Sequence, residues 1–502
     1  MPEENNDMQV GRGNFDTASY RSIFKATSLF GGVQAYQILI GVIRSKIIAV
    51  LLGPAGMGVL QLFNSSTELI KQVSSFGLSQ SAVRDVSVAA SEGDSYRIGR
   101  TIAVVKKLVW YTGLFGISLV LLISPILSKS SFGSYDYTVS FIFLSVILLF
   151  DQLSAGQKVI LQGTRKLKYL AKSSSLGLTL GLLISIPFYY FWGVDGIVPS
   201  LIISSIAALL ISVYYSRKVR YENVKIPFKE VFMEGKVMIN MGIALNLSSF
   251  FASLSSYIFR SFLSVTSGTE MVGYYAVGVT ITSSYVGMIF SAMNADFYPR
   301  LVAAVQNKEE SNRIISYQGE IGCLILGPAI IGCLLFMPLI IWLLYSSEFI
   351  VTSNYVVFAI VGMMLRLVGW LSSILFVAHG DAKLFATNEA AANLYFLLFN
   401  IIGFKVGGLT GVGISFIVSY TLYFFHIFTL AKRKYELSFS TLFIKEYLIQ
   451  ISLICLGLLI VLVIDSRLRY IIGAVLMLGA CSYSLIELNK RIKVVDYFIN
   501  RK

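Results

Sequence analysis

Residues 197–215 read IVPSLIISSIAALLISVYY, a run that contains no charged side chain. A helix of about twenty apolar residues is the length that crosses the ~30 Å hydrocarbon core of a bilayer. Similar runs recur along the chain, in which hydrophobic residues make up 56% and charged residues only 14%. That is too much apolar side chain for one soluble core. The sequence therefore predicts an all-α integral membrane protein with about fourteen transmembrane helices.

The predicted spans also give an orientation. They are residues 27–51, 57–80, 108–128, 138–160, 173–192, 197–216, 237–263, 273–295, 317–345, 354–378, 386–404, 409–431, 447–464 and 470–488. Loops on the side of the two termini carry 31 of the 41 Lys and Arg residues, and the opposite loops carry four. Because basic loops stay in the cytoplasm, we expect both termini there. Anionic lipid headgroups account for the net charge of +14, so no nucleic-acid partner is expected.

An internal repeat relates the two halves of the chain. The segment LGPAGMG at 52–58, between the first two spans, aligns with SGTEMVG at 267–273, between the seventh and eighth. Gly53 and Gly58 thereby correspond to Gly268 and Gly273 at an offset of 215 residues. Residues 192–196 and 407–411 are related by the same offset. Such parallel repeats are typical of transporters whose site lies between the two halves, near mid-membrane.

The spans and the repeat together predict the domain organisation. In chain order it comprises a cytoplasmic N-terminal lead at 1–26, an N-lobe of six spans at 27–216, a cytoplasmic linker at 217–236, a C-lobe of six spans at 237–431, a cytoplasmic loop at 432–446, a final pair of spans at 447–488 and a cytoplasmic tail at 489–502. The polar lead is not the pattern of a signal peptide. A monomer is expected, because the repeat already provides two lobes.

Three arginines, Arg44, Arg260 and Arg366, fall deep within predicted spans. Arg44 precedes Gly53 by nine residues and Arg260 precedes Gly268 by eight, which places both roughly 12–13 Å below the outer turns. Three such charges cost roughly 8–10 kcal/mol on insertion scales, so a role is expected for them. Arginine binds phosphate through two parallel hydrogen bonds, which favours an anionic ligand. A structural ion pair or snorkelling is the alternative for each.

Polar stripes and single acids supply further candidates. The seventh span carries polar residues at steps of three and four, which lie on one helical face: Asn246, Ser249, Ser253, Ser256 and Arg260. Lys71 is a further candidate for contact with the anion, although it can simply pair with Glu68 three residues earlier. Asp151 lies in the middle of its span, where it can bind a proton or cation or can serve as a counter-ion for an arginine. The same two roles are expected for Glu68. Glu320, near a cytoplasmic end, is expected to be solvated.

Other chemistry is not encoded in recognisable form. The four cysteines lie inside apolar runs without metal-ligand spacing, which favours small buried side chains over disulfides or a metal site. No P-loop and no HExxH motif occurs in the sequence. We therefore expect a secondary transporter rather than an enzyme, without a cofactor, and driven by a coupling cation, H⁺ or Na⁺.

Two stretches carry a family resemblance. They are RSKIIAVLLGPAGMG at 44–58, which is fairly specific, and YPRL at 298–301, which is shared more widely. Over essentially its whole length the chain resembles the O-antigen translocases (Wzx-type), the lipid-linked oligosaccharide flippases of the multidrug, oligosaccharidyl-lipid and polysaccharide (MOP) exporter superfamily.

The resemblance implies a V-shaped, MATE-like transporter of two six-helix lobes with two additional C-terminal helices. It would carry an undecaprenyl-diphosphate-linked repeat unit of lipopolysaccharide O-antigen, or of a similar polysaccharide, from the cytoplasmic to the periplasmic leaflet of a bacterial inner membrane. Other polysaccharide-assembly proteins would be its partners. The family's cationic central cavity would map here onto Arg44, Arg260 and Arg366.

Two alternatives stay open at this point. A cationic-drug exporter of the same superfamily should line its cavity with acids and aromatics, whereas here three arginines outnumber the one acid noted, Asp151. A membrane enzyme of polysaccharide assembly should carry a long outward loop, and the outward loops predicted here are short.

Overall fold

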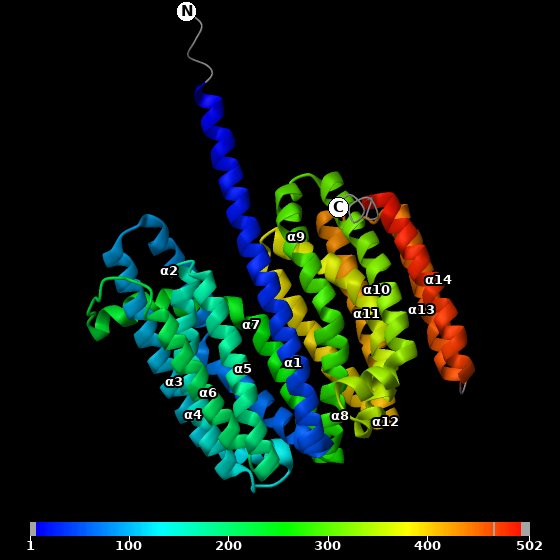
Figure 1. Cartoon of the computed structure of the whole chain (residues 1–502), viewed down its shortest axis with the longest axis horizontal. Helices are drawn as coiled ribbons and strands as arrows, with labels where there is room; N and C mark the ends of the chain where they lie inside the picture. The colour runs from blue at the N-terminus through cyan, green and yellow to red at the C-terminus, as the bar shows by residue number, and fades with distance from the viewer. Residues whose placement is uncertain (1–6, 465–466, 493–502) are drawn as a thin grey trace, which may run out of the picture. The chain divides into compact units, whose positions relative to one another are not determined.

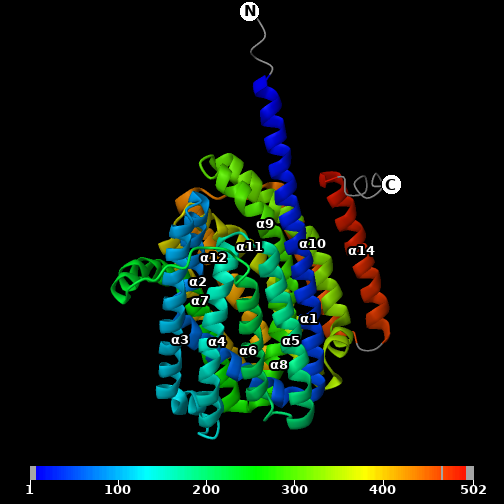
Figure 2. The same ribbon diagram turned by 60° about the vertical axis from the view of Figure 1, so that its left-hand side comes forward.

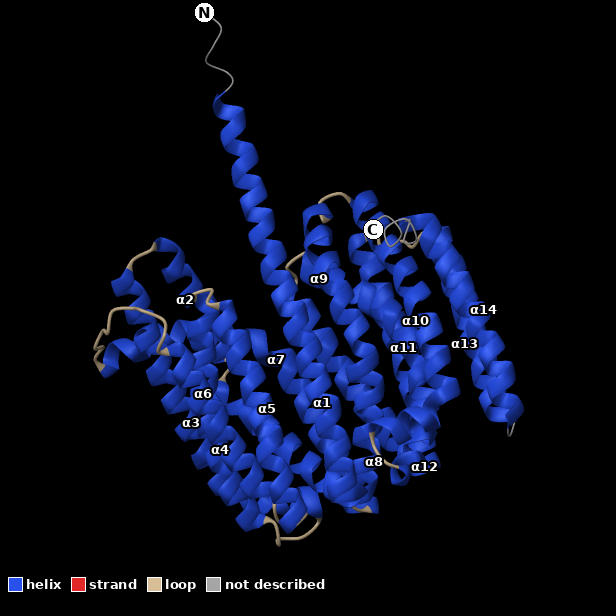
Figure 3. Ribbon diagram, in the orientation of Figure 1, coloured by secondary structure: helices blue, strands red, loops and turns tan. Residues whose placement is uncertain are grey.

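A computed structural model of the chain describes residues 7–464 and 467–492 and is all-helical over that range, as predicted (Figure 3). The helices are α1 (Asp7–Ser75), α2 (Leu78–Glu92), α3 (Ser95–Phe132), α4 (Thr138–Gly163), α5 (Leu167–Trp192), α6 (Ile197–Ser216), α7 (Phe228–Ser267), α8 (Thr269–Val279), η1 (Thr280–Val286), α9 (Gly287–Ala304), α10 (Lys308–Leu344), η2 (Ser347–Thr352), α11 (Ser353–Ala378), α12 (Ala382–Tyr435), α13 (Thr441–Val463) and α14 (Arg467–Ile492). Parts of the predicted lead and tail, residues 1–6 and 493–502, lie outside the described residues.

Twelve helices in the described ranges are long and apolar enough to cross a membrane. Two of them, α1 and α12, break at a glycine with positive φ and each cover two of the fourteen predicted spans. The apolar part of α1, Tyr36–Ser75, would measure about 60 Å as one straight helix, twice the hydrocarbon core. It is interrupted at Gly53 (φ 62°, ψ −171°). In α12 the break falls at Gly408, and its two arms lie side by side, because Ser415 Oγ donates to Asn400 Oδ1 at 2.7 Å.

The internal repeat is visible in the backbone. Gly53 (φ 62°, ψ −171°) and its partner Gly268 (φ 87°, ψ 169°) share a conformation that is strained for any residue with a Cβ. The second pair matches as well, with φ 53° and ψ −126° at Gly193, and φ 56° and ψ −140° at Gly408. The offset found in the sequence therefore relates turns of the same geometry.

Gly58 and Gly273, the other pair of repeat glycines, allow a close helix contact. A methyl group built on Gly58 would lie 1.8 Å from the carbonyl oxygen of Thr269, and one built on Gly273 would lie 2.1 Å from that of Pro54. Small residues permit such backbone approach between membrane helices. The start of the second predicted span is thereby packed directly on α8.

The chain divides into two compact units. Unit 1 comprises the chain up to Leu52 together with Ser66–Phe250, and unit 2 comprises Gly53–Ser65 and the chain from Phe251 onward. In unit 1, α4 packs against α2, α3 and α6, and α5 packs against α6 (Figures 1 and 2). In unit 2, α11 packs against α12, and α10 contacts α11, α13 and α14. The predicted domain boundaries stay predictions.

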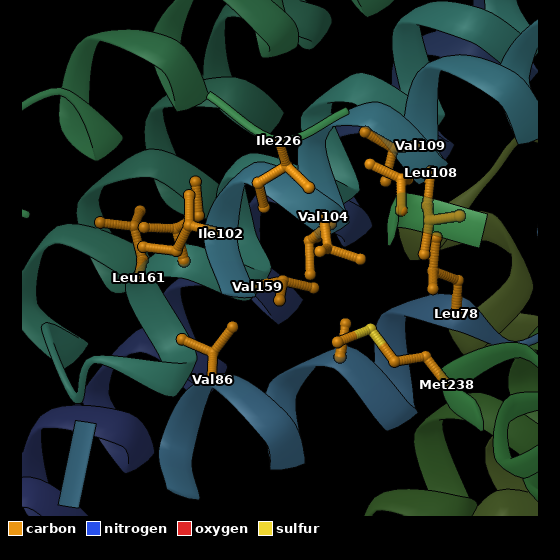
Figure 4. Close-up of a cluster of buried hydrophobic side chains, with 14 of the residues drawn as sticks. Leu78, Val86, Ile102, Val104, Leu108, Val109, Val159, Leu161, Ile226 and Met238 are labelled. Atoms are coloured by element: carbon orange, nitrogen blue, oxygen red, sulfur yellow. The ribbon is translucent and has the colours of Figure 1, made fainter. Parts of the chain in front are cut away.

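A cluster of buried hydrophobic side chains in unit 1 joins the linker to the helices (Figure 4). Ile226 of the linker meets Val104 of α3 and Val159 of α4 in this cluster. Beside it, Arg100 Nη2 on α3 forms ion pairs of 2.7 Å with the carboxylates of Glu230 and Glu234 at the start of α7. Apolar packing and charge pairing therefore both fix the segment that leads into α7.

Several local expectations differ from the structure. The predicted span 57–80 ends at Ser75, where a turn with φ 51° at Phe76 and φ 64° at Gly77 separates α1 from α2. The predicted loop 81–107 is mostly helical, formed by α2 and the start of α3. Among the cysteines, all unpaired, Cys323 is buried as expected, whereas Cys455 is exposed on α13.

The C-terminal pair α13 and α14 docks on α10 through buried charges. Arg491 of α14 donates to Glu320 of α10 and to Glu446 of α13, each at 3.0 Å. The Glu320 side chain is only 3% exposed, so the expectation that it would be solvated is wrong. The acid is a partner in an interhelical network.

Candidate functional site

Arg366 lines a cavity of about 700 Å³ in unit 2, formed by α7, α9, α11 and α12. Its guanidinium carbon lies 5.3 Å from the ring centroid of Phe290 and 5.9 Å from that of Tyr420, within cation–π range. Its polar contact is the sulfur of Met363 at 4.0 Å. No carboxylate of the described residues lies within ion-pair distance of it. The charge therefore lies beside aromatic rings, with the carboxylate of Glu389 as its electrostatic neighbour in the same cavity.

Glu389 of α12 lines the same cavity. Its Oε1 accepts a hydrogen bond of 2.8 Å from the hydroxyl of Tyr423, and its carbonyl accepts one of 2.8 Å from Asn393 Nδ2. Glu389, near the end of its predicted span, is not among the sequence-predicted candidates, which include Asp151 as the one mid-membrane acid. Asn393 follows Glu389 by four residues and Asn400 follows Asn393 by seven, so the three lie on one helical face, like the polar residues of the seventh predicted span.

A second cavity of about 450 Å³ shares Arg366, Trp370 and Asn294 with the first. Its remaining lining comes from η1 and α9: Ser283, Ser284, Gly287, Met288, Phe290 and Ser291. The element η1 is a π-helix, a rare form that is frequently found at functional sites. Arg366 and Trp370 thus stand where an aromatic cavity adjoins a hydroxyl-rich one.

Arg260 of α7 also belongs to unit 2 but lines neither cavity. Its Nε is buried and has no hydrogen-bond partner among the described residues. The phenol of Tyr275 is its electrostatic neighbour, and the Tyr275 ring packs edge-on against Phe259 with centroids 4.9 Å apart. Its role as a phosphate contact stays a prediction.

Arg44, in unit 1, is partly buried on α1. No hydrogen bond or ion pair joins it to another residue of the described ranges. Its assignment to the anion site therefore also stays a prediction.

Lys71, Glu68 and Asp151 come together in unit 1. Lys71 Nζ lies 3.8 Å from a carboxylate oxygen of each acid. Ser205 Oγ donates to Asp151 at 2.8 Å, and Gln72 Nε2 donates to Glu68 at 2.6 Å. Asp151 is thus paired with a lysine rather than with an arginine. Binding of the coupling ion by the two acids and contact of Lys71 with the cargo stay predictions.

The cavities of unit 2 define what the site can do chemically. No group of His, Cys, Asp or Glu within the described ranges is arranged to hold a metal ion. A guanidinium can bind a phosphate through two parallel hydrogen bonds. Cavities of this size, with apolar walls and a few polar groups, are typical of small-molecule sites. The two cavities thus offer a ligand one guanidinium, one carboxylate and several aromatic and polar side chains.

Two solved structures share the fold of this chain. The chain is similar to an inward-facing multidrug resistance MATE family transporter of the MOP superfamily, with a TM-score of 0.67 and 18% identity over 80% of this chain and 94% of that one. It is similar to the lipid II flippase MurJ in an inward closed conformation, with a TM-score of 0.64 and 14% identity over 92% and 99% of the two chains. The chain therefore shares the helical fold of these two proteins, with twelve candidate membrane spans in the described residues, which confirms the expected fold.

Sequence comparison identifies the family of this chain and two of its relatives. Residues 23–305 match the profile of the polysaccharide biosynthesis protein family, and the chain belongs to that family. It is also 20% identical, over 415 residues, to the lipid III flippase of Escherichia coli K12, covering 80% of this chain and 96% of that protein. The lipid III flippase of Shigella flexneri matches to the same extent.

Proposed function

We propose that this protein is a flippase for a polyprenyl-diphosphate-linked oligosaccharide. The cargo is a repeat unit of O-antigen or of a similar polysaccharide, moved from the cytoplasmic to the periplasmic leaflet of a bacterial inner membrane. The observation that carries the proposal is Arg366, a cation in a cavity of about 700 Å³ with no carboxylate of the described residues in ion-pair distance. A diphosphate is an anion that fits such a guanidinium. Family membership and the flippase relatives support the same cargo class.

The proposal includes an energy source and an orientation. With no P-loop in the sequence, alternating access is coupled to a gradient of H⁺ or Na⁺. Asp151 and Glu68, the acids of the unit 1 cluster, are the residues assigned to that ion or to charge balance. The basic loops, with 31 of the 41 Lys and Arg residues, favour cytoplasmic termini.

Export of cationic compounds is the second candidate function. Glu389 lies in the aromatic cavity together with Tyr420 and Tyr423, which is the lining expected for a cation. The two functions differ in the residue on which they depend. Flipping of a diphosphate depends on Arg366, whereas export of a cation depends on Glu389.

Replacing Arg366 by alanine is expected to reduce surface glycan at least about tenfold, because a charge-assisted hydrogen bond contributes roughly 1.5–3 kcal/mol. The gene is deleted in its host and complemented with wild type, Arg366→Ala or Arg366→Lys. Surface glycan and lipid-linked precursor facing the cytoplasm are then measured. Arg366→Lys should restore part of the glycan, since it keeps the charge but loses the bidentate geometry.

The control is Arg313→Ala, a substitution of an arginine that is 62% exposed and paired with Glu310. It should leave the surface glycan at the wild-type level. Membrane levels of each variant are compared by immunoblot. Normal glycan with Arg366→Ala would remove this residue from the site. Normal glycan in the deletion strain, without a second transporter, would contradict the flippase proposal, and loss of drug efflux in Glu389→Gln would then favour the cation exporter.

A further inference from the structure

The π-helix η1 interrupts an otherwise α-helical span. Together with α8 and the start of α9 it forms one candidate membrane span, Thr269–Asn294. A π-turn contains more residues than an α-turn, so it changes which side chains face a given neighbour. Such insertions are rare and frequently lie at functional sites. Because η1 lines a cavity together with Arg366, its side chains are candidates for ligand contacts.

The hydroxyl groups of η1 fall into two classes. Thr280 Oγ1 donates to the Ala276 carbonyl at 2.8 Å, and Thr282 Oγ1 donates to the Gly278 carbonyl at 2.9 Å, so both are satisfied within the helix. Ser283 and Ser284 line the 450 Å³ cavity, and their side-chain hydroxyls make no hydrogen bond to any residue that the structure describes. Ser283 is half-buried and Ser284 is exposed, so both hydroxyls can be reached from the cavity. The two serines are therefore available to a ligand.

The rest of this cavity's lining indicates the chemistry of the ligand. Ser291 and Asn294 add a further hydroxyl and an amide, and no acidic residue is among the residues that line it. Hydroxyl and amide groups both donate and accept hydrogen bonds. The lining offers no carboxylate to a cation, and apart from Arg366, where the diphosphate is placed, its side chains are uncharged. A neutral group with many hydroxyls, such as a sugar ring, matches a lining that offers donors and acceptors together.

We infer that the 450 Å³ cavity binds the sugar residue next to the diphosphate, with Ser283 and Ser284 as specificity-determining contacts. The inference rests on the proposed function, because it places the diphosphate on Arg366. That arginine borders both cavities, so a sugar covalently linked to the phosphate falls within reach of η1. Trp370 marks the same border, held by edge contact with Phe290 at a centroid distance of 5.6 Å.

Binding to the purified full chain in lipid nanodiscs tests the inference. The two probes are undecaprenyl diphosphate and undecaprenyl diphosphate carrying one N-acetylglucosamine, and the Kd of each is measured by tryptophan fluorescence. Ser283→Ala combined with Ser284→Ala is expected to weaken binding of the sugar-bearing probe roughly tenfold, the loss of two ordinary hydrogen bonds. The same variant should bind undecaprenyl diphosphate like the wild type.

Two further variants separate the possible outcomes. Thr280→Val combined with Thr282→Val removes hydroxyls that are satisfied within the helix and should leave both affinities unchanged. Arg366→Ala should weaken both probes. The serine variant could weaken binding of both probes equally, or of neither, while Arg366→Ala still weakens binding of both. That result would overturn the sugar site and leave the proposed function standing. Absence of binding of either probe to the wild type would overturn the proposed function as well.

Discussion

Replacing Arg491 by alanine is expected to lower the free energy of unfolding by about 3–5 kcal/mol, the cost of removing one partner from a buried ion pair. The guanidinium donates to Glu320 and Glu446 at 3.0 Å and to Glu487 at 2.7 Å, so it joins α10, α13 and α14. The side chains of Glu320 and Glu446 are 3% and 1% exposed. Without Arg491 two buried carboxylates lose their counter-charge. Denaturant titration of the purified protein measures the loss.

Lys490→Ala is the matched control for this substitution. Lys490 is the neighbouring cation, 64% exposed, and its pairing with Glu487 should contribute no more than about 1 kcal/mol. A variant that combines Arg491→Met with Glu320→Gln and Glu446→Gln carries no buried charge and should be more stable than Arg491→Ala. Stability of Arg491→Ala within about 1 kcal/mol of the wild type would contradict the role of this network.

Replacing Gly58 by alanine is expected to cost about 3 kcal/mol or more, at the upper end for overpacked cores. The new methyl group would lie 1.8 Å from the backbone carbonyl oxygen of Thr269, and a backbone atom cannot move aside as the end of a flexible side chain can. Gly273→Ala should behave in the same way, because its methyl group would lie 2.1 Å from the carbonyl oxygen of Pro54. Thermal unfolding followed by size-exclusion chromatography measures both.

Gly479→Ala serves as the control for the two glycine substitutions. Nothing lies within 4 Å of a methyl group built on Gly479 in α14, so this variant should be as stable as the wild type or slightly more stable. If Gly58→Ala unfolded at the wild-type temperature, the close packing of the second span on α8 would be wrong.

The features that the sequence predicted well are those that depend on local chemistry. Runs of apolar residues identify membrane helices because the bilayer has a fixed thickness. The paired glycines Gly53 and Gly268 were predicted as equivalent turns, and both adopt a backbone conformation that disfavours a Cβ. A repeat offset can be detected from such positions because few residue types tolerate them.

Features that depend on the third dimension were not predicted. Arg491 donates a hydrogen bond to Glu320, which lies 171 residues earlier in the chain, and the local sequence around neither residue predicts this pairing. The π-helix at 280–286 was also missed, because an additional residue in a turn does not change the hydropathy of a span. Glu389 was overlooked near the end of its span, although its spacing to Asn393 was readable. Placing Arg44 relative to Arg366 requires the arrangement of two separate units, which no periodicity encodes.

The central claim, that Arg366 binds a diphosphate during lipid flipping, is tested most directly by transport in proteoliposomes. Undecaprenyl diphosphate carrying a fluorescent disaccharide is placed in one leaflet, a Na⁺ or H⁺ gradient is imposed, and an impermeant glycosidase reports how much glycan reaches the other leaflet. Wild type should move the glycan faster than protein-free vesicles, and Arg366→Ala should be slower than wild type by roughly tenfold. Wild-type transport no faster than in protein-free vesicles under either gradient would contradict the flippase account, and equal rates for wild type and Arg366→Ala would contradict the role of this arginine.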